Sequence, residues 1–222
     1  MIIFDRATKI VRAKGIAKTI IDNVDFTIEK GQSVGLLGRN GAGKSTLLRL
    51  IAGTMQLDSG RIIRRARVSW PLGFAGSFQS SMTGEQNVRF VARVYGVDTE
   101  ALIDYVRDFA ELGPFFRSPV SIYSSGMKAR LAFGLSLGIK FDYYLVDEIT
   151  AVGDVAFRTK CRAVFNERLK DSNVIMVSHS TSTIRDYCQS GIVLENGKLQ
   201  YFNDVKDAIK DHDFNMKATL SD

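Results

Sequence analysis

The sequence predicts an α/β fold with a mostly parallel sheet and a helical subdomain inserted into it. Three observations support this class. Short apolar runs suited to buried strands alternate with segments of helical spacing. One of those runs leads directly into a glycine-rich loop and then into a helix. Between about residues 78 and 138, helical spacing has no competing strand pattern.

The expected strands are short and apolar. Asn23–Glu29 alternates, with Val24, Phe26 and Ile28 on one face, as a half-buried strand does. Further apolar runs have the length of buried parallel strands, namely Ser33–Leu37, Tyr143–Val146, Val174–Val177 and Ile192–Leu194.

The expected helices fall in both parts of the chain. Ser45–Ala52 is predicted to be a helix that ends at Gly53. Leu102, Val106 and Phe109 have helical spacing in the middle segment. In Val155–Lys170 the same spacing relates Phe157, Cys161, Val164, Phe165 and Leu169. We therefore expect one domain over 1–222, with a core of about 1–77 and 139–222 and a helical subdomain of about 78–138.

Composition narrows the class of protein without selecting a ligand. The 222 residues are 45% hydrophobic and 24% charged, with a net charge of +6. This mild basic excess fits an anionic ligand, a membrane surface or nucleic acid. Cys161 and Cys188 are too few for a disulfide framework, which favours a reducing cytosol. The longest apolar run, Leu131–Ile139, is far shorter than the ~20 residues that cross a bilayer. We expect any work at a membrane to need a partner.

A phosphate-binding loop is the strongest motif in the chain. Gly38–Ser45 satisfies G-x-x-x-x-G-K-[ST] between an apolar strand and a helix, the context of a P-loop NTPase. Lys44 should reach the β- and γ-phosphates, Ser45 should ligate Mg²⁺, and Thr46 should assist near the α-phosphate. The alternative is a glycine-rich turn that only connects two elements. The candidate nucleotide-binding residues are Gly38, Arg39, Asn40, Gly41, Ala42, Gly43, Lys44, Ser45 and Thr46.

Two acids end the apolar run that follows Phe141. A strand buried on both faces would deliver them to the sheet edge that also carries the phosphate loop. Asp147 would hold Mg²⁺, and Glu148 would orient and deprotonate the attacking water. Alternatively, both acids merely end a strand in solvent. The chain lacks the Asn-Lys-x-Asp motif of a GTPase, and the adjacent acids are unusual for a small-molecule kinase. An ATPase is the better hypothesis.

The segment Tyr123–Met127 resembles the signature motif of ATP-binding-cassette (ABC) proteins. In this chain the phosphate loop, the signature, the two acids and His179 follow one another in the order of that family. The resemblance implies a RecA-like core, an N-terminal antiparallel β subdomain and a homodimer with composite ATP sites. It also implies that Ser124, Ser125 and Gly126 close on the ATP of the partner subunit, and that His179 contacts the γ-phosphate.

Further segments resemble those of this family, and at some positions this chain differs from the family pattern. Thr150–Asp154 resembles the loop through which the two subunits communicate, with Asp154 as its acidic residue. Gln79 is the candidate for the glutamine that senses Mg²⁺ and the membrane partner, although a solvated loop glutamine is the alternative. The aromatic residue that stacks on adenine in the family should fall near Val11, where no aromatic stands.

Four segments together indicate a branch of the family. Trp70–Gly73, Gly76–Gln79, Tyr123–Met127 and Val146–Asp154 look like the ATPases of capsular polysaccharide exporters in Gram-negative bacteria. O-antigen and teichoic-acid exporters share much of this pattern. The resemblance implies a homodimer bound to a polytopic permease at the cytoplasmic face of the bacterial inner membrane, with lipid-linked polysaccharide as its cargo.

Two other functions are alternatives to polysaccharide export for this chain. A cassette ATPase that acts on nucleic acid or ribosomes has support only from Arg61–Arg67, where basic and aliphatic residues alternate. A strand with one solvated face explains that alternation more simply, so we expect no nucleic-acid partner. A scaffold that binds nucleotide without hydrolysis is disfavoured by the presence of Lys44, Asp147, Glu148 and His179.

Overall fold

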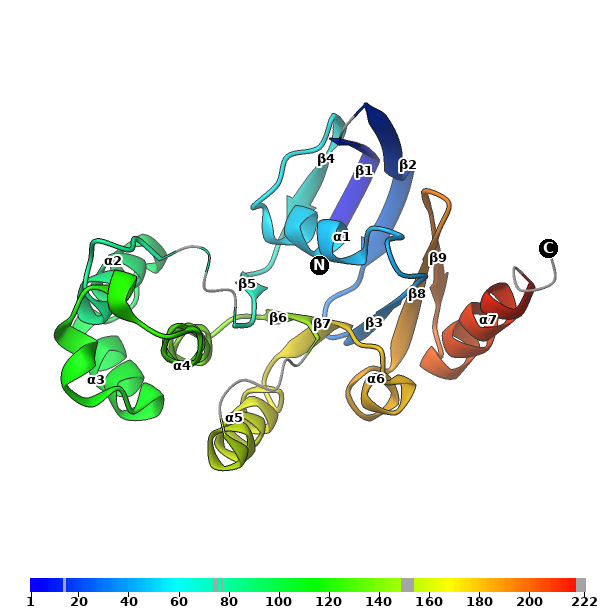
Figure 1. Ribbon diagram of the computed structural model, residues 1–222. Helices are drawn as coiled ribbons and strands as arrows, with labels where there is room; N and C mark the ends of the chain where they lie inside the picture. Colours follow the sequence, from blue (N-terminus) through cyan, green and yellow to red (C-terminus); the bar gives the residue numbers. More distant parts are fainter. Residues whose placement is uncertain (14, 74–75, 77, 149–153, 219–222) are drawn as a thin grey trace. The chain divides into compact units, whose positions relative to one another are not determined.

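The computed structural model describes residues 1–13, 15–73, 76, 78–148 and 154–218, and the chain forms two compact units (Figure 1). The first unit comprises Met1–Pro71, Phe141–Ile149 and Ser172–Asp222. The second comprises Leu72–Lys140 and Thr150–Asp171. Both sheets belong to the first unit, and the second unit is helical.

A six-stranded sheet forms the centre of the first unit. Its strands, in spatial order, are β5 (Val68–Pro71), β6 (Tyr143–Asp147), β7 (Asn173–Val177), β3 (Val34–Leu37), β8 (Ser190–Glu195) and β9 (Lys198–Phe202). The first five are parallel, and β9 pairs antiparallel with β8. The predicted strands at β3, β6, β7 and β8 are confirmed. Strands β5 and β9 were not predicted, because β5 is very short and β9 carries no continuous apolar run.

A second, antiparallel sheet is built from the N-terminal part of the chain. It has three strands in the order β2 (Ile16–Ile28), β1 (Ile2–Ala13) and β4 (Ser59–Arg64). The predicted strand Asn23–Glu29 is the second half of β2, with Val24 and Ile28 buried as the alternation required. The basic stretch from Arg61 to Arg67 contributes β4 and then leaves the sheet after Arg64. The expected N-terminal antiparallel subdomain is confirmed.

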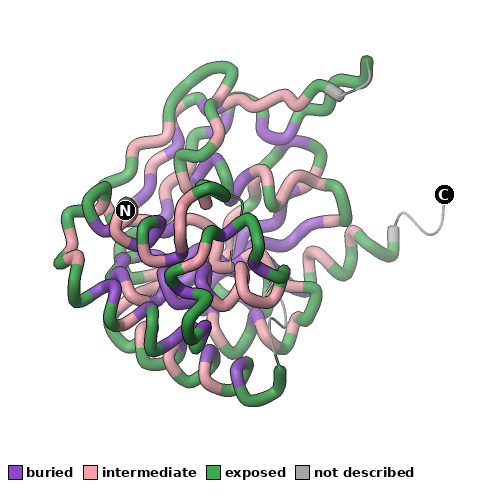
Figure 2. The backbone as a smooth tube through the Cα atoms, turned by 60° about the vertical axis from the view of Figure 1, so that its left-hand side comes forward, coloured by how far each residue is buried: buried purple, intermediate pink, exposed green. Residues whose placement is uncertain are grey.

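One hydrophobic core joins these sheets across helix α1 (Lys44–Ala52). Leu47, Leu48, Leu50 and Ile51 of α1 are fully buried in a cluster with residues of both sheets. Helices α6 (Thr181–Tyr187) and α7 (Val205–Ala218) cover the other face of the six-stranded sheet (Figure 1). Figure 2 shows the buried backbone gathered in the interior, with the exposed stretches around it. This packing anchors the N-terminus of α1 at the sheet edge.

The second unit consists of helices packed on one another. They are α2 (Gly84–Tyr95), α3 (Thr99–Ala110), the 3₁₀ helices η2 (Gly113–Arg117) and η3 (Val120–Ile122), α4 (Ser125–Gly138) and α5 (Val155–Arg168). The predicted helices at α3 and α5 are confirmed. Among the described residues, no helix is both long and apolar enough to cross a membrane.

The unit to which α5 belongs differs from the one that our expected domain boundaries gave it. We placed 139–222 in the core, whereas Thr150–Asp171 groups with the helical unit. The ring of Phe157 on α5 packs edge-on against Phe109 at 5.5 Å, and the Arg130 guanidinium lies 4.4 Å from the Phe157 ring centre. Lys160 also donates to the backbone carbonyl of Phe109 at 3.1 Å. These contacts attach α5 to α3 and α4. The α/β class itself is confirmed.

Candidate active site

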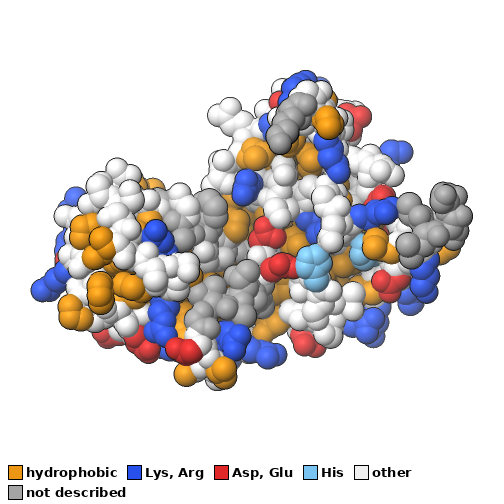
Figure 3. Space-filling model, in the orientation of Figure 1, with side chains coloured by type: hydrophobic (Ala, Val, Ile, Leu, Met, Phe, Trp, Pro, Cys, Tyr) orange, Lys and Arg blue, Asp and Glu red, His pale blue; other side chains and the backbone are white. Residues whose placement is uncertain are grey.

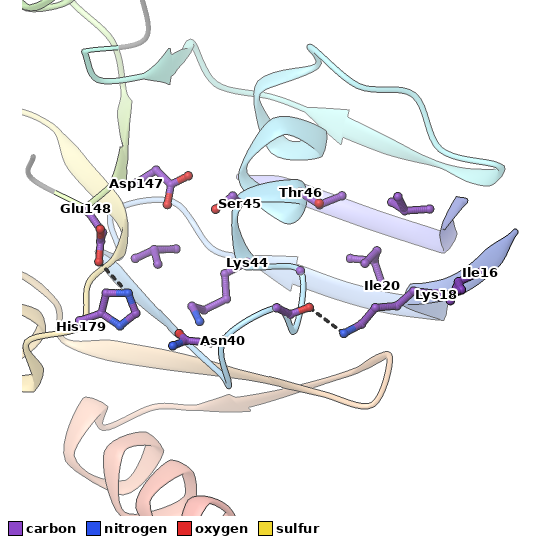
Figure 4. Close-up of a pocket in the computed structure, with 14 residues that line it drawn as sticks. Ile16, Lys18, Ile20, Asn40, Lys44, Ser45, Thr46, Asp147, Glu148 and His179 are labelled. Carbon is purple, nitrogen blue, oxygen red and sulfur yellow. Dashed lines mark hydrogen bonds and ion pairs between the residues drawn. The ribbon is translucent and has the colours of Figure 1, made fainter. Parts of the chain in front are cut away.

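The order of strands gathers the predicted hydrolytic residues at one edge of the six-stranded sheet. Strands β6, β7 and β3 are parallel neighbours, so their carboxyl ends lie side by side. The phosphate loop follows β3, Asp147 and Glu148 end β6, and His179 follows β7. All of them line one cavity of about 880 Å³ within the first unit (Figure 4). That volume is ample for a nucleotide.

Two glycines of the phosphate loop are required by its shape. Gly38 has a φ of 149°, and a Cβ there would lie 2.5 Å from the carbonyl oxygen of Leu194. Gly43 has a φ of 112°, and a Cβ there would lie 2.6 Å from Cγ2 of Ile20. A side chain at either position would both strain the backbone and collide with a neighbour. The loop can therefore follow this path only with glycine.

The loop ends on the open N-terminus of α1. Gly43 is the N-cap and supplies no side-chain hydrogen bond, and the first turn contains no acidic residue. The first N–H groups of the helix thus lack a side-chain acceptor, and the helix dipole makes this end positive. Ser45 and Thr46 lie in this turn. Such an arrangement is a binding site for phosphate.

The ammonium of Lys44 lies over the loop itself. Its Nζ donates to the carbonyl oxygens of Gly38 at 2.6 Å and Arg39 at 3.0 Å. Burial lowers the pKa of Lys44, while the nearby negative charges of Asp147 and Glu148 act in the opposite direction. The cation is partly dehydrated, so its attraction for a phosphate that enters the cavity is screened less than it would be in open water.

Glu148 and His179 form a pair across two strand ends. Nε2 of His179 lies 2.8 Å from Oε1 of Glu148, and the backbone N–H of Glu148 donates to the carbonyl of Val177 at 2.9 Å. Glu148 has a φ of 50°, a left-handed conformation that turns the chain directly after β6. Both side chains remain exposed to the cavity, at 44% for Glu148 and 66% for His179. They can orient a water molecule and accept its proton.

The side-chain oxygens of Asp147 and Ser45 suit a Mg²⁺ ion that the protein and a bound substrate would ligate together. Figure 4 shows Asp147 and Ser45 with their side-chain oxygens directed into the same part of the cavity. In the described part of the chain, no group of three or more His, Cys, Asp or Glu side chains could hold a metal ion. Mg²⁺ prefers one or two protein oxygens together with phosphate and water, rather than an all-protein cage. The residues present therefore suit it.

The far end of the cavity was predicted only in part, because the family resemblance pointed to the neighbourhood of Val11, whereas Ile16, Lys18 and Ile20 were not predicted. Val11 on β1 and Ile16, Lys18 and Ile20 on β2 line it. Nζ of Lys18 donates to the carbonyl oxygen of Gly41 at 2.7 Å and so fastens the β1–β2 hairpin to the phosphate loop (Figure 4). The sequence did contain a signal for this face, because residues two apart in a strand point to the same side, as Ile16, Lys18 and Ile20 do.

The signature residues begin α4 in the second unit. Ser124 is the N-cap, and its Oγ accepts the N–H of Met127 at 3.2 Å. Ser124 and Ser125 are exposed, Gly126 is half-buried, and the first turn contains no acidic residue. These features are those of an exposed helix N-terminus that can bind an anion. Their role toward a second subunit stays a prediction.

The backbone of Gln79 is fixed by hydrogen bonds to the side chain of Asn87. Its N–H donates to Oδ1 of Asn87 at 2.9 Å, and its carbonyl accepts from Nδ2 of Asn87 at 3.2 Å. The residue is exposed. Gln79 belongs to the second unit, and its proposed contact with Mg²⁺ stays a prediction. Ser77, two residues before it, lies outside the described residues.

Asp154 is a structural cap as well as a candidate site residue. Its Oδ1 accepts the N–H of Phe157 at 2.8 Å, and its Oδ2 lies 2.9 Å from Nη2 of Arg130. The Phe157 N–H first, and then the Arg130 charge, hold the pKa of Asp154 below its usual value. The rest of the expected communication loop, Thr150–Gly153, lies outside the described residues, as does Ile149.

Comparison with known proteins places this geometry in a family. Residues 21–151 match the family model described as ABC transporter. The polysialic acid transport ATP-binding protein KpsT of Escherichia coli is 46% identical over 215 residues, covering 96% of each chain. The capsule polysaccharide export ATP-binding protein CtrD of Neisseria meningitidis is 49% identical over 191 residues, covering 86% of this chain and 88% of that protein.

More distant proteins show the same relationship. The O-antigen export system ATP-binding protein RfbB of Klebsiella pneumoniae is 36% identical over 191 residues, covering 84% of this chain and 78% of that protein. The dimeric post-hydrolysis structure of the ATP-binding cassette MJ0796, bound to ADP and Pi, superposes with a TM-score of 0.71 at 18% identity. That match covers 90% of this chain and 97% of the other, and it establishes the fold.

The geometry of Gly43 yields a prediction for nucleotide binding. Gly43→Ala should weaken ATP binding at least about tenfold, because backbone strain of ~1–3 kcal/mol is relieved only if the loop moves its N–H groups. Titration with a fluorescent ATP analogue measures the affinity, and circular dichroism checks the fold. Adding Ile20→Ala removes the collision but not the strain, so we expect partial recovery. Wild-type affinity in Gly43→Ala would contradict this account.

Proposed function

The chain belongs to the family of ABC transporter ATPases, and from that membership we propose that it energises export of a capsular, lipid-linked polysaccharide through a separate permease. The hydrolytic part rests on one observation above all. Lys44, Asp147 and the Glu148–His179 pair line the same cavity as the phosphate loop. The cargo is proposed from the relatives that are named for polysaccharide transport and capsule export.

ATP binding would begin at the phosphate loop and the start of α1. The N–H groups of the loop and the helix N-terminus receive the phosphate oxygens. Lys44 would leave the carbonyls of Gly38 and Arg39 for the β- and γ-phosphates, exchanging one set of oxygen acceptors for another. Ser45 and Asp147 would hold Mg²⁺ against the same phosphates, where the ion supplies neutralisation of negative charge.

Hydrolysis would then depend on the pair at the strand ends. Glu148 holds the attacking water and accepts its proton as the oxygen bonds to the γ-phosphorus and the bond to the β-phosphate oxygen breaks. His179 lies 2.8 Å from Glu148 and would orient both that carboxylate and the γ-phosphate. Lys44 and the fixed N–H groups of the loop stabilise the charge that develops on the phosphate oxygens.

A second copy of the chain would complete the site. Ser124, Ser125 and Gly126 form an exposed helix N-terminus with no acidic residue in its first turn. We propose that this end closes on the γ-phosphate of ATP in the partner subunit, as it does in the family. Closure would exclude bulk water, which strengthens each electrostatic contact in the site. Loss of the γ-phosphate after hydrolysis would loosen the dimer.

The permease would be contacted by the second unit. Gln79 is tied to α2 through Asn87, and Phe90 and Val94 on that helix are 60% and 62% exposed. With Gln86, these side chains are spaced by four residues and form one exposed stripe on α2. Figure 3 shows hydrophobic side chains on the surface of this unit. An exposed apolar stripe of this kind fits contact with a protein partner. We propose that the complex of ATPase and permease lies at the cytoplasmic face of the inner membrane.

The carboxylate of Glu148 gives the test of hydrolysis. Glu148→Gln should lower ATP turnover at least about a hundredfold because the general base is lost. ATP should still bind, and a dimer should accumulate when ATP is present. Phosphate release and light scattering after gel filtration measure the two effects. As a control, Lys44→Ala should lose ATP binding and stay monomeric. Wild-type turnover in Glu148→Gln would remove Glu148 from the role of base.

The same substitution in cells tests the cargo. With chromosomal Glu148→Gln in the native host, we expect capsular polysaccharide to vanish from the surface and to accumulate inside the cell. Fractionation followed by sugar analysis measures both pools, and a plasmid with the wild-type gene should restore the surface polymer. An unchanged capsule would refute the capsule assignment. Loss of O-antigen instead would indicate that this chain energises O-antigen export, the function named for the 36% identical relative.

The exposed stripe on α2 yields a prediction about the permease. The double variant Phe90→Ser/Val94→Ser should lower surface polysaccharide about tenfold, because two apolar contacts at the interface are lost. The ATPase rate of the purified subunit should not change. Phe214→Ser is a matched control, since Phe214 is also exposed, at 71%, but lies on α7. Normal export by the double variant would show that the permease does not contact this stripe.

A further inference from the structure

Tyr123 is a buried residue of the second unit to which the hydrolytic mechanism gives no role. It directly precedes Ser124, the N-cap of α4, and only 5% of its surface is exposed. Its hydroxyl donates to the carbonyl oxygen of Phe115 in η2 at 2.7 Å. Burial raises the pKa of this hydroxyl, while a hydrogen bond from the backbone N–H of Gly84 acts in the opposite direction. One oxygen atom thus connects η2 to the first residue of α2.

Close packing at Gly84 supports this contact. A Cβ at Gly84 would collide with the hydroxyl oxygen of Tyr123 and would lie 3.0 Å from the carbonyl oxygen of Phe116. Gly84 is not one of the glycines with a positive φ, so its backbone conformation is open to other residues. The nearness of Tyr123 and Phe116 is therefore what excludes a side chain at this position.

Two backbone hydrogen bonds connect the residues before Tyr123 to those that lead into α2. The N–H of Ser121 donates to the carbonyl oxygen of Ser80 at 2.8 Å, and the N–H of Val120 donates to that of Met82 at 2.9 Å. Together with the hydroxyl of Tyr123, these bonds hold the N-terminus of α4 against the N-terminus of α2. Both helices belong to the second unit (Figure 1).

The two helices joined in this way carry the two contacts that the proposed function assigns to the second unit. Helix α2 presents the stripe with Phe90 and Val94 to the permease, and α4 begins at Ser124 of the signature. We propose that Tyr123 is a positioning residue for ATP hydrolysis, because its hydroxyl fixes Ser124 and the N-terminus of α4 relative to α2, in the place from which they close on the ATP of a second copy. The inference rests on the proposed function, in which Ser124 contacts that ATP.

Accurate placement matters at this end of α4. The dipole of a helix and its free N–H groups act on an anion only close to the first turn. Displacement of a positioned group by about 1 Å can lower a rate about a hundredfold. Without the hydroxyl, the carbonyl of Phe115 and the N–H of Gly84 lose the partner that they share, and the distance between η2 and α2 is no longer set by hydrogen bonds to Tyr123. A small structural change would therefore have a large effect on hydrolysis.

Association of the chain in the presence of ATP tests the position of the signature directly. In the Glu148→Gln background, which traps the dimer, Tyr123→Phe should weaken ATP-dependent dimerisation about fivefold because the signature is misplaced. Sedimentation equilibrium at several protein concentrations measures the dissociation constant of the dimer. The affinity of the monomer for a fluorescent ATP analogue should stay within about twofold, since the phosphate loop lies in the first unit.

Tyr201→Phe in the same background is the matched control. It also removes a hydroxyl hydrogen bond, the one from Tyr201 to Oε1 of Gln32 at 3.0 Å, but within the first unit. Dimerisation of this variant should be unchanged. An equal weakening in the Tyr123 and Tyr201 variants would show that the effect is not specific to the start of α4, and would overturn the inference.

Steady-state kinetics separate positioning from a general loss of stability. With Glu148 intact, Tyr123→Phe should lower kcat about tenfold and change the KM for ATP less than about twofold, because the contact that is lost is made only when the site closes. Melting followed by circular dichroism checks that the variant is folded at the assay temperature. A variant that had only lost stability would keep the wild-type kcat at a temperature where all of it is folded, and that result would contradict a positioning role.

A double-mutant cycle tests the contact between Tyr123 and Gly84. Gly84→Ala alone should lower kcat about tenfold, since the added methyl group displaces the hydroxyl. In the Tyr123→Phe background the same change should cost less than about threefold more, because the oxygen with which the methyl group collides is absent. Fully additive effects would show that the two residues act independently, and the inference would fail.

The outcomes distinguish this inference from the proposed function. Wild-type dimerisation and kcat in Tyr123→Phe would refute the positioning role of Tyr123 and leave the proposed function intact. Failure of Glu148→Gln to dimerise in the presence of ATP would instead refute the proposed composite site.

Discussion

The parallel pairing of β3, β6 and β7 is the constraint on which the rest of the structure depends. These strands are buried on both faces along most of their length, so only side chains at their ends can reach a ligand. Polar chemistry is possible only where they end. Parallel order puts all three carboxyl ends at one edge, and the loop after β3, the acids after β6 and the histidine after β7 meet there. The hydrophobic core thereby determines where hydrolysis can occur.

Several candidate functional groups lie at helix ends or are fixed by backbone hydrogen bonds. Lys44 and Ser45 begin a helix whose inner face is fully buried, and Glu148 is fixed through its backbone to Val177. In the second unit, Ser124 and Asp154 are both N-caps whose side chains accept backbone N–H groups. These residues are therefore positioned at helix ends or by a backbone hydrogen bond to the neighbouring strand. Positioning of this kind is what a charge-stabilising site requires.

The elements that were predicted correctly are those marked by short patterns of neighbouring residues. The glycines and Lys44 of the phosphate loop, the apolar strands of the parallel sheet and the acids at their ends are all local patterns. Strand β1 was missed because Arg6 has a φ of 48° and the pairing with β2 shifts register there, which breaks the alternation. At the hairpin end of the cavity, Ile16, Lys18 and Ile20 were not predicted as lining residues. They come close to Val11 only through the register of β1 with β2, which no local pattern specifies.

The hydrogen bonds of Lys44 to its own loop bear on what a substitution at this position would remove. Its Nζ donates to the carbonyl oxygens of Gly38 and Arg39, so the ammonium ties the start of the loop to the start of α1. One side chain therefore has two functions, since it supplies positive charge and also holds the backbone of the loop. Replacing Lys44 by a neutral residue would remove the charge and this internal tie together.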